Sequence, residues 1–178
     1  MGRGISARVG RTALALAGLA VALGGLAAPP AAALGAGDAA PQFTARALEG
    51  PGQLSLADYR GKLVYLDFWA SWCPPCLVSL PELEALRQEY AGRGLEIVAV
   101  NLDRDLEQAR RFLKKHPVGY ASASDPEGRI PRTFEVETMP TSFLIDRDGV
   151  IRHVQAGFRK GDVEGLRKRI DALLGAAR

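Results

Sequence analysis

Cys73 and Cys76 are the only two cysteines in the 178-residue chain, and they lie three positions apart. If Cys73 lies at the first turn of a helix, the two side chains share one face, with Cβ atoms about 5–6 Å apart. A disulfide needs Cβ atoms about 3.5–4.5 Å apart, so a small adjustment of that turn would join the sulfurs. The spacing therefore predicts a redox-active dithiol.

The expected position of this pair gives the two sulfurs different roles. A helix N-terminus offers unpaired backbone N–H groups and the positive end of the helix dipole, and both favour the thiolate of Cys73. Cys73 is thus the expected nucleophile. Cys76, one turn further in, is expected to be more buried and to act as the resolving thiol. Pro74 and Pro75 are compatible with a helix start, since Pro is tolerated there.

Two other interpretations of the cysteines are weaker. A static disulfide would close a loop of only a few residues, which restrains the unfolded chain little. A zinc site usually takes four ligands, often from two such pairs, whereas the chain has only two histidines, His116 and His153, both distant in sequence. We therefore expect no metal and no cofactor other than the Cys73–Cys76 disulfide.

The sequence around the cysteines resembles a known active site. The segment 68–76, Phe-Trp-Ala-Ser-Trp-Cys-Pro-Pro-Cys, is similar to that of the thioredoxin superfamily, and more closely to the TlpA/ResA-like exported thiol:disulfide oxidoreductases. The similarity extends from about Gly37 to the C-terminus. It implies a protein-disulfide reductase in which Cys73 attacks a client disulfide and Cys76 resolves the mixed disulfide.

An acidic residue, Asp67, lies within an apolar segment six residues before Cys73. Burial disfavours a carboxylate, so its pKa should be raised, and it could exchange a proton with Cys76. Asp67 matches the buried aspartate of thioredoxins, although an acid at the sheet edge, hydrated in a cleft, is the alternative. Ala99 falls where thioredoxins carry a lysine near that aspartate, and Ser79 falls where many TlpA/ResA-like proteins carry a glutamate.

The segment Met139-Pro140-Thr141 resembles the loop that faces the cysteines in this superfamily. The resemblance implies a cis peptide bond before Pro140, and a free backbone at Met139 that pairs with an extended client segment. An ordinary trans turn before a strand is the alternative. We expect Trp72, Met139 and Thr141 to contact the client, Trp72 through an apolar docking surface, and Trp69 to belong to the core.

Apolar patterns predict an α/β fold. Strands are expected at 43–47, 53–56, 63–69, 95–100, 120–123, 141–145 and 150–156, and helices at 74–91, 105–116, 131–134 and from 162 onward. This order is that of a thioredoxin-like fold: a central mixed sheet flanked by helices, preceded by a β-hairpin. The long connection from Cys76 to Pro140 resembles the central strand-helix insertion of the TlpA/ResA group.

Residues 1–33 are predicted to be a targeting segment. Three arginines precede an uncharged run at 12–28, followed by prolines and alanines. The run is long for a signal peptide and short for a membrane span; we favour a cleaved signal peptide over an N-terminal membrane anchor. Either way the chain is exported, to the periplasm or the outer face of the cytoplasmic membrane. Residues 34–40 are expected to be a linker, and 41–178 the thioredoxin-like domain.

Charge gives no indication of a nucleic-acid partner. The net charge of +3 comes from the arginines of residues 1–33, which leaves 20 basic and 20 acidic residues in the remainder. We expect a monomer whose partners are exported proteins with disulfides. The family resemblance implies a membrane electron donor of the DsbD/CcdA type, and clients in cytochrome c maturation or oxidase assembly.

Two other functions are compatible with such a fold. A thiol peroxidase would have Thr-x-x-Cys at its reactive cysteine, whereas Ala70 stands three residues before Cys73. A copper-handling protein would use both cysteines with His116 or His153.

Pro74 favours a reducing role for the dithiol, because it lacks an N–H that could stabilise the Cys73 thiolate.

Overall fold

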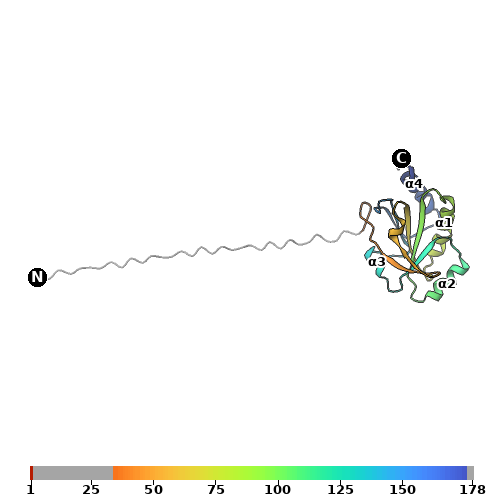
Figure 1. Cartoon of the computed structure of the whole chain (residues 1–178), viewed down its shortest axis with the longest axis horizontal. Coiled ribbons are helices and arrows are strands. Elements are labelled where there is room, and N and C mark those ends of the chain that lie inside the picture. The colour runs from red at the N-terminus through yellow and green to blue at the C-terminus, as the bar shows by residue number, and fades with distance from the viewer. Residues whose placement is uncertain (2–33, 176–178) are drawn as a thin grey trace. The chain divides into compact units, whose positions relative to one another are not determined.

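A computed structural model describes residues 34–175, together with Met1. The predicted targeting segment therefore lies outside the described residues, apart from Met1. Within the described part, seven strands form one sheet in the order β2-β1-β5-β4-β3-β6-β7. Figure 1 shows the chain with helices α1 to α4 labelled. None of the helices found there is long and apolar enough to cross a membrane.

The bounds of the elements agree closely with the predicted ones. The strands are β1 (Thr44–Ala47), β2 (Gln53–Ser55), β3 (Leu63–Trp69), β4 (Leu95–Asn101), β5 (Ala121–Ser124), β6 (Thr141–Ile145) and β7 (Ile151–Ala156). The helices are the short 3-10 helix η1 (Leu56–Tyr59), α1 (Cys76–Glu89), α2 (Leu106–Lys115), α3 (Arg129–Thr133) and α4 (Asp162–Gly175).

The sheet is mixed, as predicted. Strands β3, β4 and β5 are parallel to one another, whereas β6 pairs antiparallel with β3, and β7 pairs antiparallel with β6. The β1–β2 hairpin joins at the other end, where β1 pairs antiparallel with β5. Strand β5 and helix α3 form the predicted insertion, and β5 connects the hairpin to the central strands.

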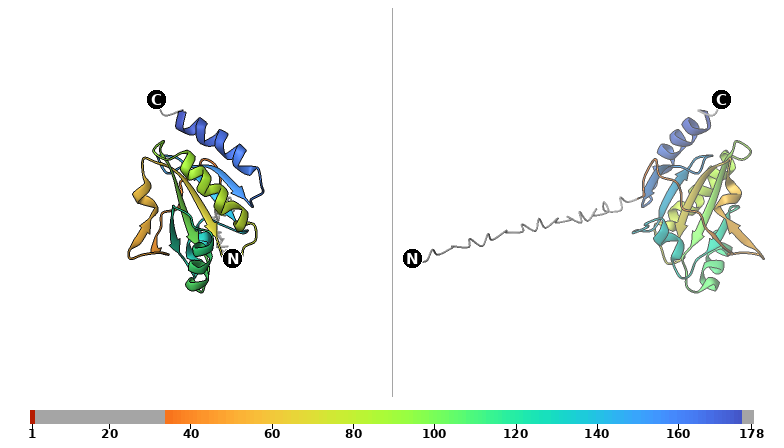
Figure 2. Two further views of the ribbon diagram at one scale, coloured as in Figure 1. Left: turned by 90° about the vertical axis from the view of Figure 1, so that its right-hand side faces the viewer. Right: turned by 60° about the vertical axis from the view of Figure 1, so that its left-hand side comes forward.

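Strand β3 separates two cores, and all seven of its residues are buried. Leu63, Tyr65 and Trp69 belong to the core beneath α1, α2 and α4, and the intervening apolar residues belong to the core on the α3 side. Because strand side chains alternate between faces, Asp67 points to the first core, which also contains both cysteines. Helices α1 and α4 lie side by side on this face (Figure 2).

Part of the predicted linker at 34–40 belongs to the domain. The N–H of Gly37 donates to the carbonyl of Ile151, the N–H of Ile151 donates to the carbonyl of Asp38, and Ala40 is buried. The linker prediction is therefore wrong for residues 37–40. Strand β7 is at the edge of the sheet, and its unpaired backbone groups provide partners that a sequence pattern does not reveal.

The start of α1 also differs from the prediction. The helix begins at Cys76 rather than at Pro74, so Cys73 precedes its first turn. Leu77, which the helical pattern places on the apolar stripe with Leu80, Leu83 and Leu86, is 44% exposed. In the first turn the buried residues are Cys76 and Ser79, so Leu77 and Val78 lie on the outward face of the helix.

Candidate active site

The sulfurs of Cys73 and Cys76 are joined in a disulfide, and the two Cα atoms are 5.4 Å apart. The pair follows the carboxyl end of β3 through a turn in which the N–H of Cys73 donates to the carbonyl of Ala70. Cys73 is 3% exposed and Cys76 is fully buried. Cys73 is therefore the sulfur nearer to solvent, in the order expected for a nucleophile and a resolving thiol.

The backbone donors near the disulfide differ from those expected. Pro74 and Pro75 have no N–H, while the N–H of Cys76 donates to the carbonyl of Cys73 and that of Leu77 to Pro74. The prediction that unpaired N–H groups stabilise the Cys73 thiolate is therefore wrong for this structure. The helix dipole remains as a source of stabilisation. A thiolate at Cys73 is thus held less strongly than at a helix start with free N–H groups.

Apolar side chains surround the buried disulfide at the surface. Trp72 is 61% exposed, Leu77 44% and Val78 39%, and Pro74 and Pro75 are also exposed. We call these five residues the apolar collar. Apart from Met1, its tryptophan, leucine and valine are the exposed large apolar residues of the part of the chain that the structure describes. Trp69, by contrast, is buried and its indole N–H donates to the hydroxyl of Ser122, as expected of a core residue.

Asp67 is fully buried on the face of β3 that carries the disulfide core. Desolvation raises the pKa of its carboxyl to about 7, although a hydrogen bond from Ser142 opposes the shift. The Ser142 hydroxyl donates to Oδ1 at 2.7 Å, while Oδ2 has no hydrogen-bond partner among the described residues. The predicted rise of the pKa by burial is confirmed, and the alternative of a hydrated edge acid is wrong.

The sheet register explains the surroundings of this carboxyl. Asp67 pairs with Ala99 on β4 and with Ser142 on β6. Ala99 lies beside Asp67 on β4, as predicted, and brings no charge to it. On the other side, Ser142 of β6 supplies one neutral hydrogen-bond donor. Desolvation therefore outweighs the stabilisation of the carboxylate, and the group titrates near neutral pH.

Two tyrosine hydroxyls are buried in the same core without a hydrogen-bond partner in the described part of the chain, those of Tyr65 and Tyr120. Burial and the nearby charge of Asp67 raise the pKa of both phenols, so they stay neutral. The environment of Asp67 is thus mostly apolar, with a few neutral polar groups. Such an environment favours a carboxyl that holds a proton at mildly acidic pH.

The loop opposite the cysteines has the geometry that the family resemblance implies. The Met139–Pro140 peptide bond is cis, and Met139 is half-buried against the core. Thr141 is buried, and its hydroxyl donates to the carbonyl of Thr138 at 2.8 Å. Its side chain therefore braces the loop, and its contact with a client stays a prediction.

Two buried polar residues that the sequence analysis missed hold the turn before the cysteines. The carboxylate of Asp103 accepts hydrogen bonds from the N–H of Ser71 at 2.9 Å and from its hydroxyl at 2.7 Å. The side-chain amide of Asn101 donates to the same carboxylate at 2.6 Å. Asn101 is the last residue of β4 and Asp103 follows two positions later, and since β3 and β4 are parallel their carboxyl ends meet at one edge. That placement after a buried strand was the available signal.

Residues named as possible metal ligands lie in different surroundings. The His116 ring contacts that of Phe112, with centroids 4.8 Å apart, and His153 lies on β7. Within residues 34–175, no three His, Cys, Asp or Glu side chains come together as a metal ion would require.

Ser79 is buried in the first turn of α1, next to the Cys-Pro-Pro-Cys motif, and its hydroxyl donates to the carbonyl of Cys76 at 3.4 Å.

A disulfide-bonded cysteine pair follows the carboxyl end of β3, a cis-proline loop leads into the neighbouring strand β6, and a buried acid lies on β3 itself. These features define the class: the chain is a thiol-disulfide oxidoreductase of the thioredoxin-like fold. Comparison with known proteins narrows the assignment. Residues 35–170 match the family model described as Redoxin, and the chain belongs to that family.

The chain is also similar to thiol-disulfide oxidoreductases from several bacteria. The thiol-disulfide oxidoreductase ResA of Bacillus thuringiensis is 37% identical over 135 residues, which cover 75% of this chain and 78% of that protein. ResA of Geobacillus kaustophilus is 33% identical over 133 residues, which cover 74% and 76%. A crystal structure of a DsbE-type thiol:disulfide interchange protein from Chlorobium tepidum matches with a TM-score of 0.77 and 44% identity, over 80% of this chain and 99% of that one.

Replacing Asp67 by Asn should stabilise the oxidised protein at neutral pH. Below about pH 4 the carboxyl is protonated in both folded and unfolded chains; between its ordinary pKa of 3.8 and the folded value of about 7, only the unfolded chain ionises. The wild type therefore loses up to about 4 kcal/mol as the pH rises through this window. Urea unfolding from pH 4 to 8 should show the stability advantage of Asp67→Asn growing by a few kcal/mol, with a plateau above pH 7.

Asp58→Asn, at an exposed acid, controls for the loss of one negative charge. A difference between Asp67→Asn and wild type that is the same at every pH would contradict the assigned pKa.

Proposed function

We propose that the protein is exported and reduces disulfides in envelope proteins, with clients of the cytochrome c maturation or oxidase assembly type. The observation that carries the direction of the reaction is the backbone around Cys73: two prolines without N–H groups, followed by amides already bonded to carbonyls. A dithiol becomes strongly oxidising when its thiolate is strongly stabilised. Here few donors do so, which supports a reducing dithiol.

The proposed reaction begins with the Cys73 thiolate, which attacks one sulfur of a client disulfide and releases the other client sulfur as a thiolate. A mixed disulfide between Cys73 and the client results. Asp67, a carboxylate in part at neutral pH, accepts the proton of the Cys76 thiol. The Cys76 thiolate then attacks Cys73 and releases the second client sulfur. The client gains two electrons, and the protein ends in the oxidised form with the Cys73–Cys76 disulfide.

The surroundings of Cys73 support polypeptide clients. The apolar collar presents Trp72, Leu77 and Val78 at the surface beside the nearly buried sulfur. An apolar surface of this kind binds exposed apolar segments, which incompletely folded proteins offer. The half-buried Met139 lies on the loop opposite, where its backbone would pair with the client segment next to the attacked sulfur.

Repeated reduction requires an electron source, because an oxidising compartment does not maintain free thiols. The predicted targeting segment and the resemblance to exported TlpA/ResA-like proteins support a location outside the cytoplasm. The same resemblance supports a membrane electron donor of the DsbD/CcdA type, which would reduce the Cys73–Cys76 disulfide after each turnover.

The reduction potential should lie nearer that of thioredoxin, about −270 mV, than that of DsbA, about −120 mV. Equilibration with reduced and oxidised dithiothreitol, followed by tryptophan fluorescence, measures it. Pro74→Gly provides the matched comparison, since it restores an N–H near the sulfur. One added donor worth about 1.4 kcal/mol to the thiolate would raise the potential by about 30 mV. A wild-type value above about −150 mV would contradict a reducing role.

The Cys76→Ser variant should retain clients as stable mixed disulfides, because Cys73 can still attack while the resolving thiol is missing. Expression in the native host, purification without reductant and mass spectrometry of the bound chains would identify them. The control variant Cys73→Ser/Cys76→Ser should retain none. Capture of cytoplasmic proteins alone would contradict the proposed envelope clients.

A further inference from the structure

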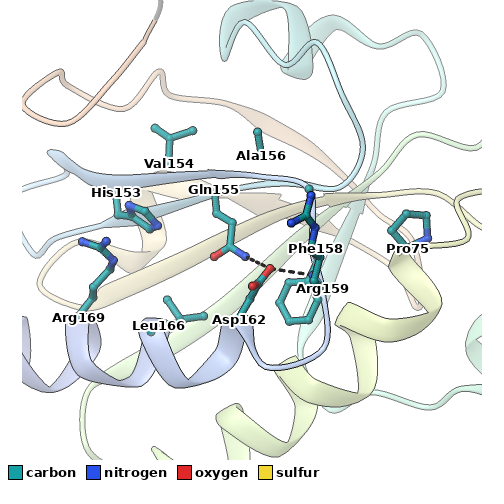
Figure 3. Close-up of a pocket in the computed structure, with 12 residues that line it drawn as sticks. Pro75, His153, Val154, Gln155, Ala156, Phe158, Arg159, Asp162, Leu166 and Arg169 are labelled. Carbon is teal, nitrogen blue, oxygen red and sulfur yellow. Dashed lines mark hydrogen bonds between the residues drawn. The ribbon is translucent and has the colours of Figure 1, made fainter.

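An open groove of about 690 Å³ lies between strand β7 and helix α4 (Figure 3). Pro75 of the dithiol motif lines one end of it, so the groove begins beside the disulfide. Its wall is tied to the loop opposite the cysteines, because the N–H of Gly157 donates to the carbonyl of Pro140 at 2.7 Å. A client segment that leaves the reacting cysteine can therefore enter this groove directly.

The groove follows the edge of β7 rather than one of its faces. Successive residues of the strand, His153 to Ala156, all line it, although neighbouring side chains in a strand point to opposite faces. In the described part of the chain, the segment 37–40 pairs with this edge only near the start of β7. The remaining edge can accept a backbone in extended conformation, as in β-strand addition.

The opposite wall comes from one face of α4. Asp162, Gly165, Leu166 and Arg169 line the groove, and positions spaced by three and four residues share a helix face. Leu166 and Phe158 are buried and give the groove an apolar floor. The groove thus combines a free strand edge with a helical wall.

The charged side chains of the groove that form no ion pair with the described residues are positive. Arg159 and Arg169 are exposed, and no carboxylate of the described residues lies within 4.0 Å of either guanidinium. The carboxylate that lines the groove, Asp162, already accepts the N–H of Arg159 at 2.8 Å and the side-chain amide of Gln155 at 3.2 Å. Burial and the charge of Arg169 lower the pKa of His153. At neutral pH the two arginines therefore determine the sign of the charge in the groove.

We propose that this groove binds an extended, acidic segment of the client next to the cysteine that Cys73 attacks. The inference rests on the proposed function as a disulfide reductase and adds a preference among its substrates. Carboxylates of the client would pair with Arg159 and Arg169, while its backbone lies along β7. Opposite charge accelerates encounter, and this acceleration decreases with ionic strength.

The test uses synthetic decapeptides, each with one cysteine and joined as a symmetrical disulfide dimer. One pair of peptides carries two Glu or two Gln before the cysteine, and a second pair carries them after it. The reduced full-length protein supplies two electrons to each dimer and releases two thiol peptides, which chromatography measures. In one of the two pairs, the Glu peptide should be reduced faster than the Gln peptide at low salt, by about twofold to fivefold for each arginine that it contacts. This difference in rate should be smaller at high salt.

Arg159→Gln and Arg169→Gln should each diminish the preference for Glu, while the rates for the Gln peptides stay unchanged. Arg46→Gln is the matched control, because this exposed arginine lies on β1, at the far side of the sheet. Equal rates for Glu and Gln peptides in both pairs, or an equal loss of preference in Arg46→Gln, would overturn the inference while disulfide reduction stands. Failure to reduce any of the peptides would contradict the proposed function and, with it, this inference.

Discussion

The burial of the Asp67 carboxyl, with the hydroxyl of Ser142 as its one hydrogen-bond donor among the described residues, is the constraint on which the chemistry of this site depends. A carboxyl in an apolar core loses hydration, and the one neutral donor restores only part of it. The result is a group with a pKa of about 7 behind the disulfide. The register of β3 with its neighbours fixes this arrangement, because Ala99 and Ser142 are the residues paired with Asp67. A buried acid of this kind lowers the stability of the folded protein above pH 4. We infer that this loss of stability accompanies the proposed use of Asp67 in proton transfer.

Around Cys73, the part of the site nearer the surface, the backbone amides determine how strongly a thiolate is stabilised. Pro74 and Pro75 remove two N–H groups from the helix start, and the next amides bond to backbone carbonyls. The sulfur of Cys73 therefore depends on the helix dipole and on its slight exposure for reactivity. Asp103 holds Ser71 and so fixes the turn that presents this sulfur. We therefore propose that the sheet residues around Asp67 set the proton transfer, and that the chain around Cys73 sets the reduction potential.

Most of the fold could be predicted from the sequence, since β3 and β4 are continuous apolar runs and Cys73 with Cys76 marks the point between strand and helix. What failed were details decided by tertiary contacts. Residues 37–40 pair with an edge strand far away in sequence, and Leu77 is exposed because Cys76 and Ser79 are the residues that face the core in the first turn of α1. Thr141 bonds within its own loop, which its residue type does not indicate. The buried acid was recognisable within an apolar strand, whereas its serine partner required the strand pairing.

The rate at which Cys76 resolves a mixed disulfide, measured as a function of pH, tests the central role of Asp67 most directly. A mixed disulfide between Cys73 and a model thiol can be formed at low pH, and release of that thiol followed after a rapid pH jump. If Asp67 accepts the proton of Cys76, the rate for the wild type should rise through a transition near pH 7, and the rate for Asp67→Asn should lack that transition and be slower between about pH 7 and 8. Identical profiles for the two proteins would contradict this role of Asp67.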